Sequence, residues 1–296
     1  MPYLGELSAL LTAVLWSGTS LAFSSAAIKI GPLQLNINRM ILASIFLFAT
    51  IFILNFSLNI SSNQIIYLSI SGIIGLVFGD SFLFKAYQLI GARISMLLMA
   101  LSPAMSAFLA YIFLDESLTF WGIIGMIVTI LGIAFVVLER NEQLDKKFSI
   151  KKTGIFYGIL GALGQAAGLI FAKLAFQESE VDKMSATFIR LISSVALMLP
   201  AAIIIRRYRN PITLYKNNLK ALGATLIGTI LGPYLGITFS LVAIDNTKVG
   251  IAATLMSTMP IIMLPMVKYI YKETLSWRSI TGAFIAVAGV AILFLR

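Results

Sequence analysis

The chain lacks cysteine and histidine entirely over its 296 residues. Without cysteine it forms no disulfide and offers no thiolate nucleophile, and without histidine it has no imidazole to bind a metal or relay a proton. Any proton transfer therefore falls to carboxylates. We expect neither a metal site nor a bound cofactor.

Charge is also scarce, since Asp, Glu, Lys and Arg make up 11% of the residues while 59% are hydrophobic. The mean hydropathy of +0.96 is far above that of a water-soluble domain with a polar surface. A bilayer core about 30 Å thick needs roughly 20 apolar residues per helical span, and such runs fill most of this chain. The composition predicts a multi-pass integral protein of the cell membrane.

Breaks rich in charged or turn-forming residues divide the chain into ten apolar segments. We expect helices over Leu7–Ala27, Leu33–Leu54, Ile65–Leu89, Ile94–Leu114, Phe120–Leu138, Thr153–Phe176, Ala186–Ile205, Leu219–Ile244, Val249–Tyr271 and Ile280–Leu295. The first segment is interpreted as a span and not as a cleavable signal, because it lacks a basic start and carries Glu6 there. The predicted fold class is thus all-α, with ten transmembrane helices.

The second half of the sequence repeats the first at a fixed offset. Pro103 aligns with Pro260, and 260 minus 103 gives 157. The same offset aligns Gly75 with Gly232, Gly79 with Gly236, Phe82 with Phe239, Glu116 with Glu273, Gly125 with Gly282, and Gly132 with Gly289. Biased composition matches leucines by chance but not this set of glycines, prolines and glutamates, so the chain is an internal duplication.

Each half contains five predicted helices, an odd number, so the second half begins on the opposite side of the membrane. The two repeats, residues 1–140 and 153–296, are therefore inverted, and a charged linker over residues 141–152 joins them. Inverted repeats let a secondary carrier expose one central site alternately to either side, because two similar units can exchange conformations.

Basic residues are distributed unevenly between the two sides. Seventeen of the 22 Lys and Arg residues lie in or beside the loops joining helices 1–2, 3–4, 5–6, 7–8 and 9–10, and the other five are Lys173, Lys183, Arg190, Lys248 and Arg296. The positive-inside rule places the seventeen in the cytoplasm and both termini outside. Topology also accounts for the net charge of +10, so we expect no nucleic-acid partner.

The segment ISMLLMALSPAMSAFLAYIFLDESLTFWGIIGMIVTILGIAFVVL, Ile94–Leu138, and its counterpart Gly250–Leu295 share a proline, a glutamate and paired glycines at equal spacing. Both resemble the second part of an EamA-type repeat, and AVLWSGTS, Ala13–Ser20, resembles its tryptophan-containing first helix. The chain therefore resembles the ten-helix branch of the drug/metabolite transporter superfamily over nearly its whole length. The resemblance implies a carrier whose central cavity is lined mainly by helices 1, 3, 4, 6, 8 and 9.

Asp80 is the one acidic residue that lies well inside a predicted span. A carboxylate at the bilayer centre costs about 2.5 to 3.5 kcal/mol on insertion scales, so it needs a wet cavity, a cation or a proton. Lys85 lies five residues on, at an awkward angle around the same helix, and Arg39 of the second helix is the better partner. Two interpretations remain open, a structural ion pair and a cavity residue that carries a coupling proton.

Two arginines begin equivalent helices of the two repeats, Arg39 in the second and Arg190 in the seventh. Because the repeats are inverted, we expect these arginines on opposite faces of the membrane. They serve either as membrane anchors or as attractors of anionic substrates.

Pro103 and Pro260 fall in the middle of the fourth and ninth helices, where a proline removes a backbone hydrogen bond and introduces a bend. We expect both to act as hinges. Ser102, Ser257 and Thr258 lie beside these bends and offer hydroxyls either to the freed backbone or to a ligand.

Small and polar residues recur on the helices assigned to the cavity. Gly75, Gly79, Gly228, Gly232 and Gly236 lie at four-residue spacing, as helix packing or a smooth wall beside a substrate path requires. The candidate cavity residues are Trp16, Ser17, Thr19, Arg39, Asp80, Gln165, Tyr234, Thr238 and Thr258. Glu116 and Glu273, at the starts of the fifth and tenth helices, are interpreted as caps that complement the helix dipole.

The leading functional hypothesis is a secondary transporter that exports small metabolites, amino acids or similar amphipathic compounds, with protons coupled through Asp80. No G-x-x-x-x-G-K-[ST] motif is present for ATP drive of the P-loop kind. The alternative is a membrane-embedded enzyme acting on lipid or isoprenoid substrates, although the clustered interfacial acids or histidines that such chemistry uses are missing. The expected partners are a small-molecule substrate and the lipid bilayer, for a monomer or a homodimer.

Overall fold

The computed structural model describes residues 3–56, 60–113, 119–137, 151–246, 252, 255–272 and 275–294. Within this part of the chain every regular element is a helix, of α or π type. The first half contains α1 (Leu4–Ile30), α2 (Pro32–Leu54), α3 (Ser62–Gly72), η1 (Ile73–Gly79), α4 (Asp80–Met99), α5 (Ser102–Phe113) and α6 (Phe120–Val137). The second half contains α7 (Lys152–Glu178), α8 (Lys183–Ile204), α9 (Pro211–Lys216), α10 (Leu219–Thr229), η3 (Ile230–Gly236), α11 (Ile237–Asn246), α13 (Met259–Met266), η4 (Val267–Tyr271) and α14 (Trp277–Phe294).

Six helices are long and apolar enough to cross a membrane, and four shorter apolar helices accompany them in the described residues. The four shorter ones are Ser102–Phe113, Phe120–Val136, Met259–Ile270 and Trp277–Ile292. The predicted all-α membrane fold is confirmed. The proposed helix caps Glu116 and Glu273, and residues 141–150 of the predicted linker, lie outside the described residues.

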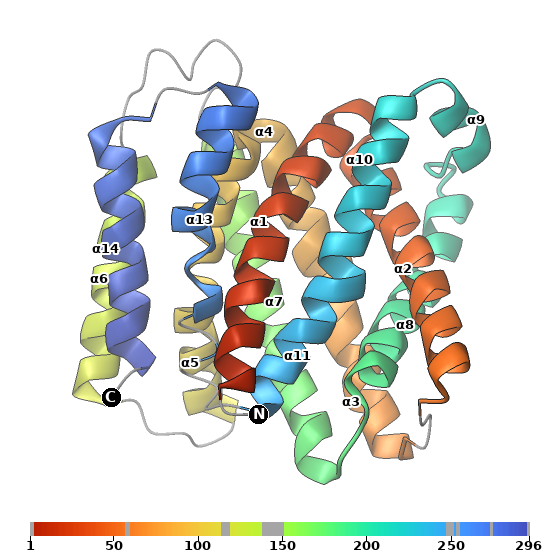
Figure 1. Cartoon of the computed structure of the whole chain (residues 1–296), viewed down its shortest axis with the longest axis horizontal. Coiled ribbons are helices and arrows are strands. Elements are labelled where there is room, and N and C mark those ends of the chain that lie inside the picture. The colour runs from red at the N-terminus through yellow and green to blue at the C-terminus, as the bar shows by residue number, and fades with distance from the viewer. Residues whose placement is uncertain are drawn as a thin grey trace.

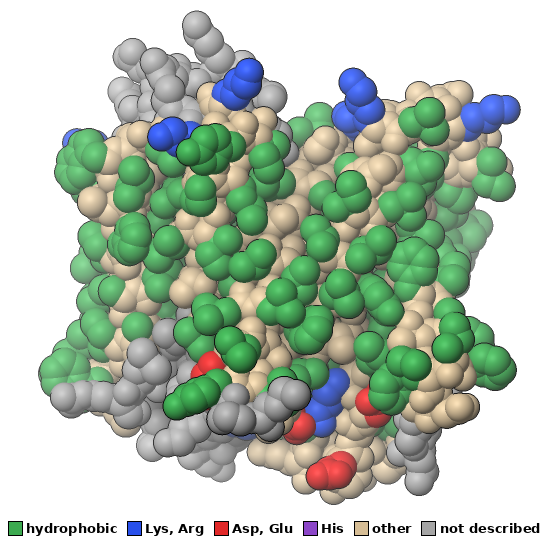
Figure 2. Space-filling model, viewed as in Figure 1, with side chains coloured by type: hydrophobic (Ala, Val, Ile, Leu, Met, Phe, Trp, Pro, Cys, Tyr) green, Lys and Arg blue, Asp and Glu red, His purple; other side chains and the backbone are tan. Residues whose placement is uncertain are grey.

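The two halves run in opposite directions through the molecule. In Figure 1 the first helix, α1, starts at the edge where both chain ends lie and runs to the other edge, where α7 starts and runs back. We call these the terminal edge and the basic edge, because Figure 2 shows Lys and Arg side chains along the second and acidic side chains near the first. The predicted inversion of the repeats is confirmed.

The internal symmetry extends to local backbone irregularities. The π-helical segment η1 spans Ile73–Gly79 and η3 spans Ile230–Gly236, and 230 minus 73 gives the sequence offset of 157. A π-helix is rare and often marks a functional position. Asp80 directly follows η1 and Ile237 directly follows η3. The two repeats therefore share a π-helical segment at the same position but differ in the side chain that follows it.

The repeats are interleaved, so that neither forms a separate body. Across the repeats, α7 packs on α3, η1 and α4, α1 packs on α10, η3 and α11, and α6 packs on α14. Glycines allow the close approach, because a Cβ on Gly164 would lie 2.6 Å from the Cα of Gly79. At the contact between α1 and α10, a Cβ on Gly228 would lie 2.3 Å from the Phe23 ring. Tight packing is therefore the main role of these glycines.

Interruptions divide the longer helical paths near the predicted hinges. Residues 100–101 form a turn before Pro103, and residues 257–258 form a turn before Pro260, which is the second residue of α13. Gly91 adds a sharper break inside α4, with φ of 75° and ψ of 170°, a conformation that an L-residue rarely adopts. The helices are broken where bends were predicted, and movement about these points stays a prediction.

Candidate functional site

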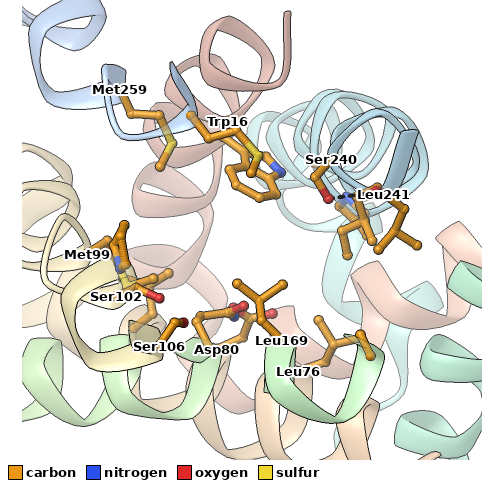
Figure 3. A pocket seen from close by; sticks show the side chains of 18 of the residues that line it. Trp16, Leu76, Asp80, Met99, Ser102, Ser106, Leu169, Ser240, Leu241 and Met259 are labelled. Carbon is orange, nitrogen blue, oxygen red and sulfur yellow. Dashed lines mark hydrogen bonds between the residues drawn. The ribbon is translucent and has the colours of Figure 1, made fainter. Parts of the chain in front are cut away.

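A cavity of about 230 Å³ lies between the two repeats. Side chains from α1, α4, α5, α7, α11 and α13 line it, and Figure 3 shows Trp16 and Met259 facing Asp80, Ser106 and Leu169 across the empty space. Most of the lining is apolar. Among the described lining residues, one is acidic and three are basic, namely Asp80, Arg39, Lys173 and Arg190.

The cavity reaches from the middle of the molecule towards the terminal edge. Its lining includes Phe176, near the end of α7, and Ile244, near the end of α11, and both helices end at that edge. Towards the basic edge the buried side chains of Phe23, Phe84 and Met263 pack in one cluster. The lining therefore extends towards the terminal edge, whereas apolar side chains pack between the cavity and the basic edge.

Asp80 and Arg39 form a buried ion pair at the inner end of the cavity. The Arg39 guanidinium donates to one carboxylate oxygen of Asp80, and Gln165 Nε2 donates to the other at 2.6 Å. Gln165 also donates to the carbonyl oxygen of Gly75 at 3.2 Å, which fixes the position of its amide. The predicted pairing of Asp80 with Arg39 is confirmed, and both carboxylate oxygens are occupied.

Other side chains also fix the position of the Arg39 guanidinium. Its Nε donates to Asn36 Oδ1 at 2.9 Å, and its guanidinium carbon lies 4.7 Å from the ring centre of Phe84 and 5.6 Å from that of Phe23. A guanidinium over an aromatic face is attracted by the ring quadrupole. Arg39 therefore belongs to the structure of the site and has little donor capacity left for a ligand.

Arg190 reaches the same region from α8 but is held differently. It is 3% exposed, lines the cavity, and its Nε has no hydrogen-bond partner in the described part of the chain. Close contact with α3 brings it inward, because a Cβ on Gly72 would lie 2.2 Å from the Arg190 carbonyl oxygen. A Cβ on Gly75 would lie 3.5 Å from Arg190 Nη2. Arg39 comes from α2, which starts at the basic edge, and Arg190 from α8, which starts at the terminal edge, yet both side chains line the same cavity.

The structure brings together about half of the predicted site residues. Trp16, Thr19, Arg39, Asp80, Gln165 and Pro103 line the cavity, whereas Ser17, Tyr234, Thr238, Thr258 and Pro260 do not. The three hydroxyls outside the lining bond to their own helices: Ser17 to the carbonyl oxygen of Ala13, Thr238 to that of Tyr234, and Thr258 to that of Leu255. Tyr234 points away and shares a hydrogen bond of 2.8 Å with Thr50 Oγ1. Backbone bonding of this kind satisfies a hydroxyl in an apolar helix.

Comparison with known families decides the identity of this architecture. The model of the EamA-like transporter family matches the chain over residues 3–138 and again over residues 152–295. The chain belongs to the EamA-like transporter family. It is accordingly a membrane transporter of the drug/metabolite type. The duplicated match agrees with the two repeats found in the sequence.

Solved structures confirm the fold of this EamA-like transporter. A crystal structure described simply as "Crystal structure of protein" has a TM-score of 0.69 to this chain at 16% identity. The match covers 98% of this chain and 96% of that one. No curated protein sequence matches.

Several lining residues of this EamA-like transporter are not among the candidates that the sequence indicates. Arg190 was weighed as an anchor or an anion attractor without a place in the cavity, and Ser106, Ser240 and Met99 gave no distinct signal. Ser106 Oγ is buried without a partner in the described residues, so it too is available to a ligand. In the same described residues no cluster of His, Cys, Asp and Glu is fit to hold a metal.

Proposed function

We propose that this EamA-like transporter exports small amphipathic metabolites, amino acids or similar compounds, from the cytoplasm across the cell membrane by alternating access. The observation that carries the proposal is the cavity between inverted repeats, whose lining extends towards the terminal edge and is separated from the basic edge by apolar packing. Its apolar walls suit the body of such a compound, and its few charged and hydroxyl groups suit a polar end.

Proton coupling through Asp80 is the second part of this proposal. As an ion, Asp80 holds Arg39 and accepts from Gln165. A proton on the carboxylate removes the charge attraction to Arg39 and leaves a neutral group at the junction of η1 and α4. Because this junction lies between helices of both repeats, loss of the ion pair would loosen their contact and permit the cavity to close on one side and open on the other.

The charge asymmetry supports the orientation of this cavity in the membrane. Basic side chains gather along the edge that the cavity does not reach, and the positive-inside rule places that edge in the cytoplasm. The conformation would then be the outward-facing one, ready to release an exported compound. Both chain ends lie at the opposite edge, which corresponds to the outside.

Metabolite profiling of overexpressing cells, with the cytosol compared to the medium, tests the proposal. Ser106→Trp fills the cavity, whereas Phe108→Trp on the same helix adds bulk to a ring that is already 52% exposed. We expect at least one small metabolite to be depleted in the cytosol and enriched in the medium with the wild type and Phe108→Trp, but not with Ser106→Trp. An unchanged metabolite profile, or equal export by both variants, would contradict the proposal.

A further inference from the structure

Five basic residues and no acidic residue lie between the end of α8 and the start of α10. We call residues 203–220 the basic loop, and its five cations are Arg206, Arg207, Arg209, Lys216 and Lys220. All five residues are exposed, and none forms an ion pair within the part of the chain that the structure describes. Figure 2 shows basic side chains at the corner of the basic edge where Figure 1 places α9. The basic loop thus presents positive charge that no acidic residue of its own neutralises.

Side-chain hydrogen bonds fix the backbone of the basic loop against α2. Gln34 accepts from the Arg209 backbone nitrogen at 2.9 Å and donates to the Arg209 carbonyl oxygen at 3.1 Å. The Tyr208 hydroxyl donates to Asn38 Oδ1 at 2.9 Å, and the Tyr215 hydroxyl accepts from Asn38 Nδ2 at 3.0 Å. The cations therefore project from a backbone that is already ordered, which lowers the entropy cost of binding a ligand.

Exposed apolar side chains accompany these cations along the chain. Ile204 and Ile205 lie at the end of α8, just before the first arginine, and they are 78% and 58% exposed. Ile212 belongs to the six-residue helix α9 and is 77% exposed. Cations beside exposed apolar side chains are typical of a segment at a membrane interface, where the charges meet anionic headgroups and the apolar side chains meet acyl chains.

We propose that the basic loop is a binding site for anionic phospholipid, whose phosphate contacts Arg206, Arg207 and Arg209 and whose acyl chains contact the neighbouring isoleucines. The positive-inside rule accounts for basic residues at this edge, but it requires neither an ordered backbone nor exposed isoleucines among the cations. At the repeat offset, 203 minus 157 is 46 and 220 minus 157 is 63, and residues 46–63 contain no charged residue. The lipid site therefore belongs to the second repeat alone.

Native mass spectrometry of the purified full chain in detergent counts the phospholipid molecules that the chain retains. Separate titrations with phosphatidylglycerol, which is anionic, and phosphatidylcholine, which is neutral overall, give an apparent Kd for each. We expect phosphatidylglycerol to bind roughly 10-fold more tightly or better, because each nearby cation favours an anionic lipid several-fold. The variant with Arg206→Gln, Arg207→Gln and Arg209→Gln should lose roughly 10- to 100-fold in affinity for phosphatidylglycerol and none for phosphatidylcholine.

A charge-matched variant separates a local site from the effect of net charge. Lys29→Gln, Lys268→Gln and Lys272→Gln remove three exposed lysines from the ends of two other helical paths at the basic edge. This variant should keep the wild-type affinity for phosphatidylglycerol. Lys216→Gln with Lys220→Gln removes the other two cations of the basic loop and should weaken phosphatidylglycerol binding about 5- to 30-fold. It tests the site even if the triple arginine variant fails to fold.

Equal losses of phosphatidylglycerol affinity in the basic-loop and charge-matched variants would overturn the proposal, because net charge alone would then explain the binding. Equal affinity of the wild type for the two lipids would overturn it as well. Glycerol 3-phosphate carries the phosphate without acyl chains, and its displacement of phosphatidylglycerol at equal concentration would show a site for free phosphate and not for lipid. All of these measurements read lipid binding, so the export tested by Ser106→Trp stands or falls separately.

Discussion

Thr129 and Ala286 occupy equivalent positions of the two repeats and contact each other directly. Thr129 Oγ1 donates to the carbonyl oxygen of Ala286 at 3.3 Å, and the two residues are 157 positions apart. Residues related by a pseudo-twofold axis meet only where that axis passes. The axis therefore runs between α6 and α14, at the end of the molecule away from α2 and α8 (Figure 1).

Close packing at this axis predicts that Gly132→Ala destabilises the protein. A Cβ on Gly132 would lie 2.5 Å from the backbone nitrogen of Ala286, so α6 and α14 must separate. Gly223→Ala on α10 is the matched control, because its Cβ would meet nothing within 4 Å. We expect Gly132→Ala to lower the free energy of unfolding by about 1 to 3 kcal/mol, seen as a lower midpoint in thermal unfolding. Equal midpoints for the two variants would contradict the packing.

The buried ion pair predicts a compensating double variant. Arg39→Gln leaves the Asp80 carboxylate without its cation, a change that costs about 3 to 5 kcal/mol for buried pairs in soluble proteins. Arg39→Gln with Asp80→Asn removes both charges, and we expect it to unfold at a higher temperature than Arg39→Gln alone. If the double variant were the less stable one, the pair would not be coupled as the geometry indicates.

The proposed proton coupling predicts that Asp80→Asn uncouples transport from the proton gradient while the protein still folds. Asn keeps the size of the side chain and can still accept from Gln165, but it cannot carry a proton. In vesicles with an imposed pH gradient, the wild type should accumulate the substrate identified by profiling, whereas Asp80→Asn should only equilibrate it. Accumulation by Asp80→Asn at the wild-type level would assign Asp80 a purely structural role.

The contact between α3 and α8 predicts opposite outcomes for two glycines three residues apart. Gly72→Ala would place its Cβ 2.2 Å from the Arg190 backbone and push α8 outward, whereas Gly75→Ala would make an ordinary 3.5 Å contact with Nη2. We expect Gly72→Ala to lower the thermal midpoint and Gly75→Ala to change it little. The reverse order would show that α8 does not pack against Gly72 as closely as the structure indicates.

Sequence alone predicted the ten apolar segments, the duplication and the pairing of Asp80 with Arg39. Each has a strong physical signal, because apolar length, a fixed offset and a lone intramembrane acid leave few other arrangements. The breaks before Pro103 and Pro260 follow for the same reason, since proline cannot donate to the helix.

The position of individual side chains around the cavity was not predictable in the same way. Ser17 and Thr238 lie on the expected helices, but a hydroxyl in an apolar helix satisfies itself on the carbonyl of the preceding turn. Loop counting places Arg190 near the opposite edge from Arg39 and does not show that its side chain reaches the same cavity. Its convergence with Arg39 depends on the close approach of α8 to Gly72, a tertiary contact that one sequence does not reveal.

The proposed transport needs a water-accessible path between the repeats, and single cysteines test for it directly because the chain has no cysteine of its own. Ser106 lies in the cavity lining, and Phe108 on the same helix lies outside it with an exposed ring that we expect to face the lipid. An impermeant thiol reagent added to intact cells should modify Ser106→Cys and block export, and should leave Phe108→Cys unmodified. Modification of both cysteines at equal rates, or of neither, would contradict the cavity as the transport path.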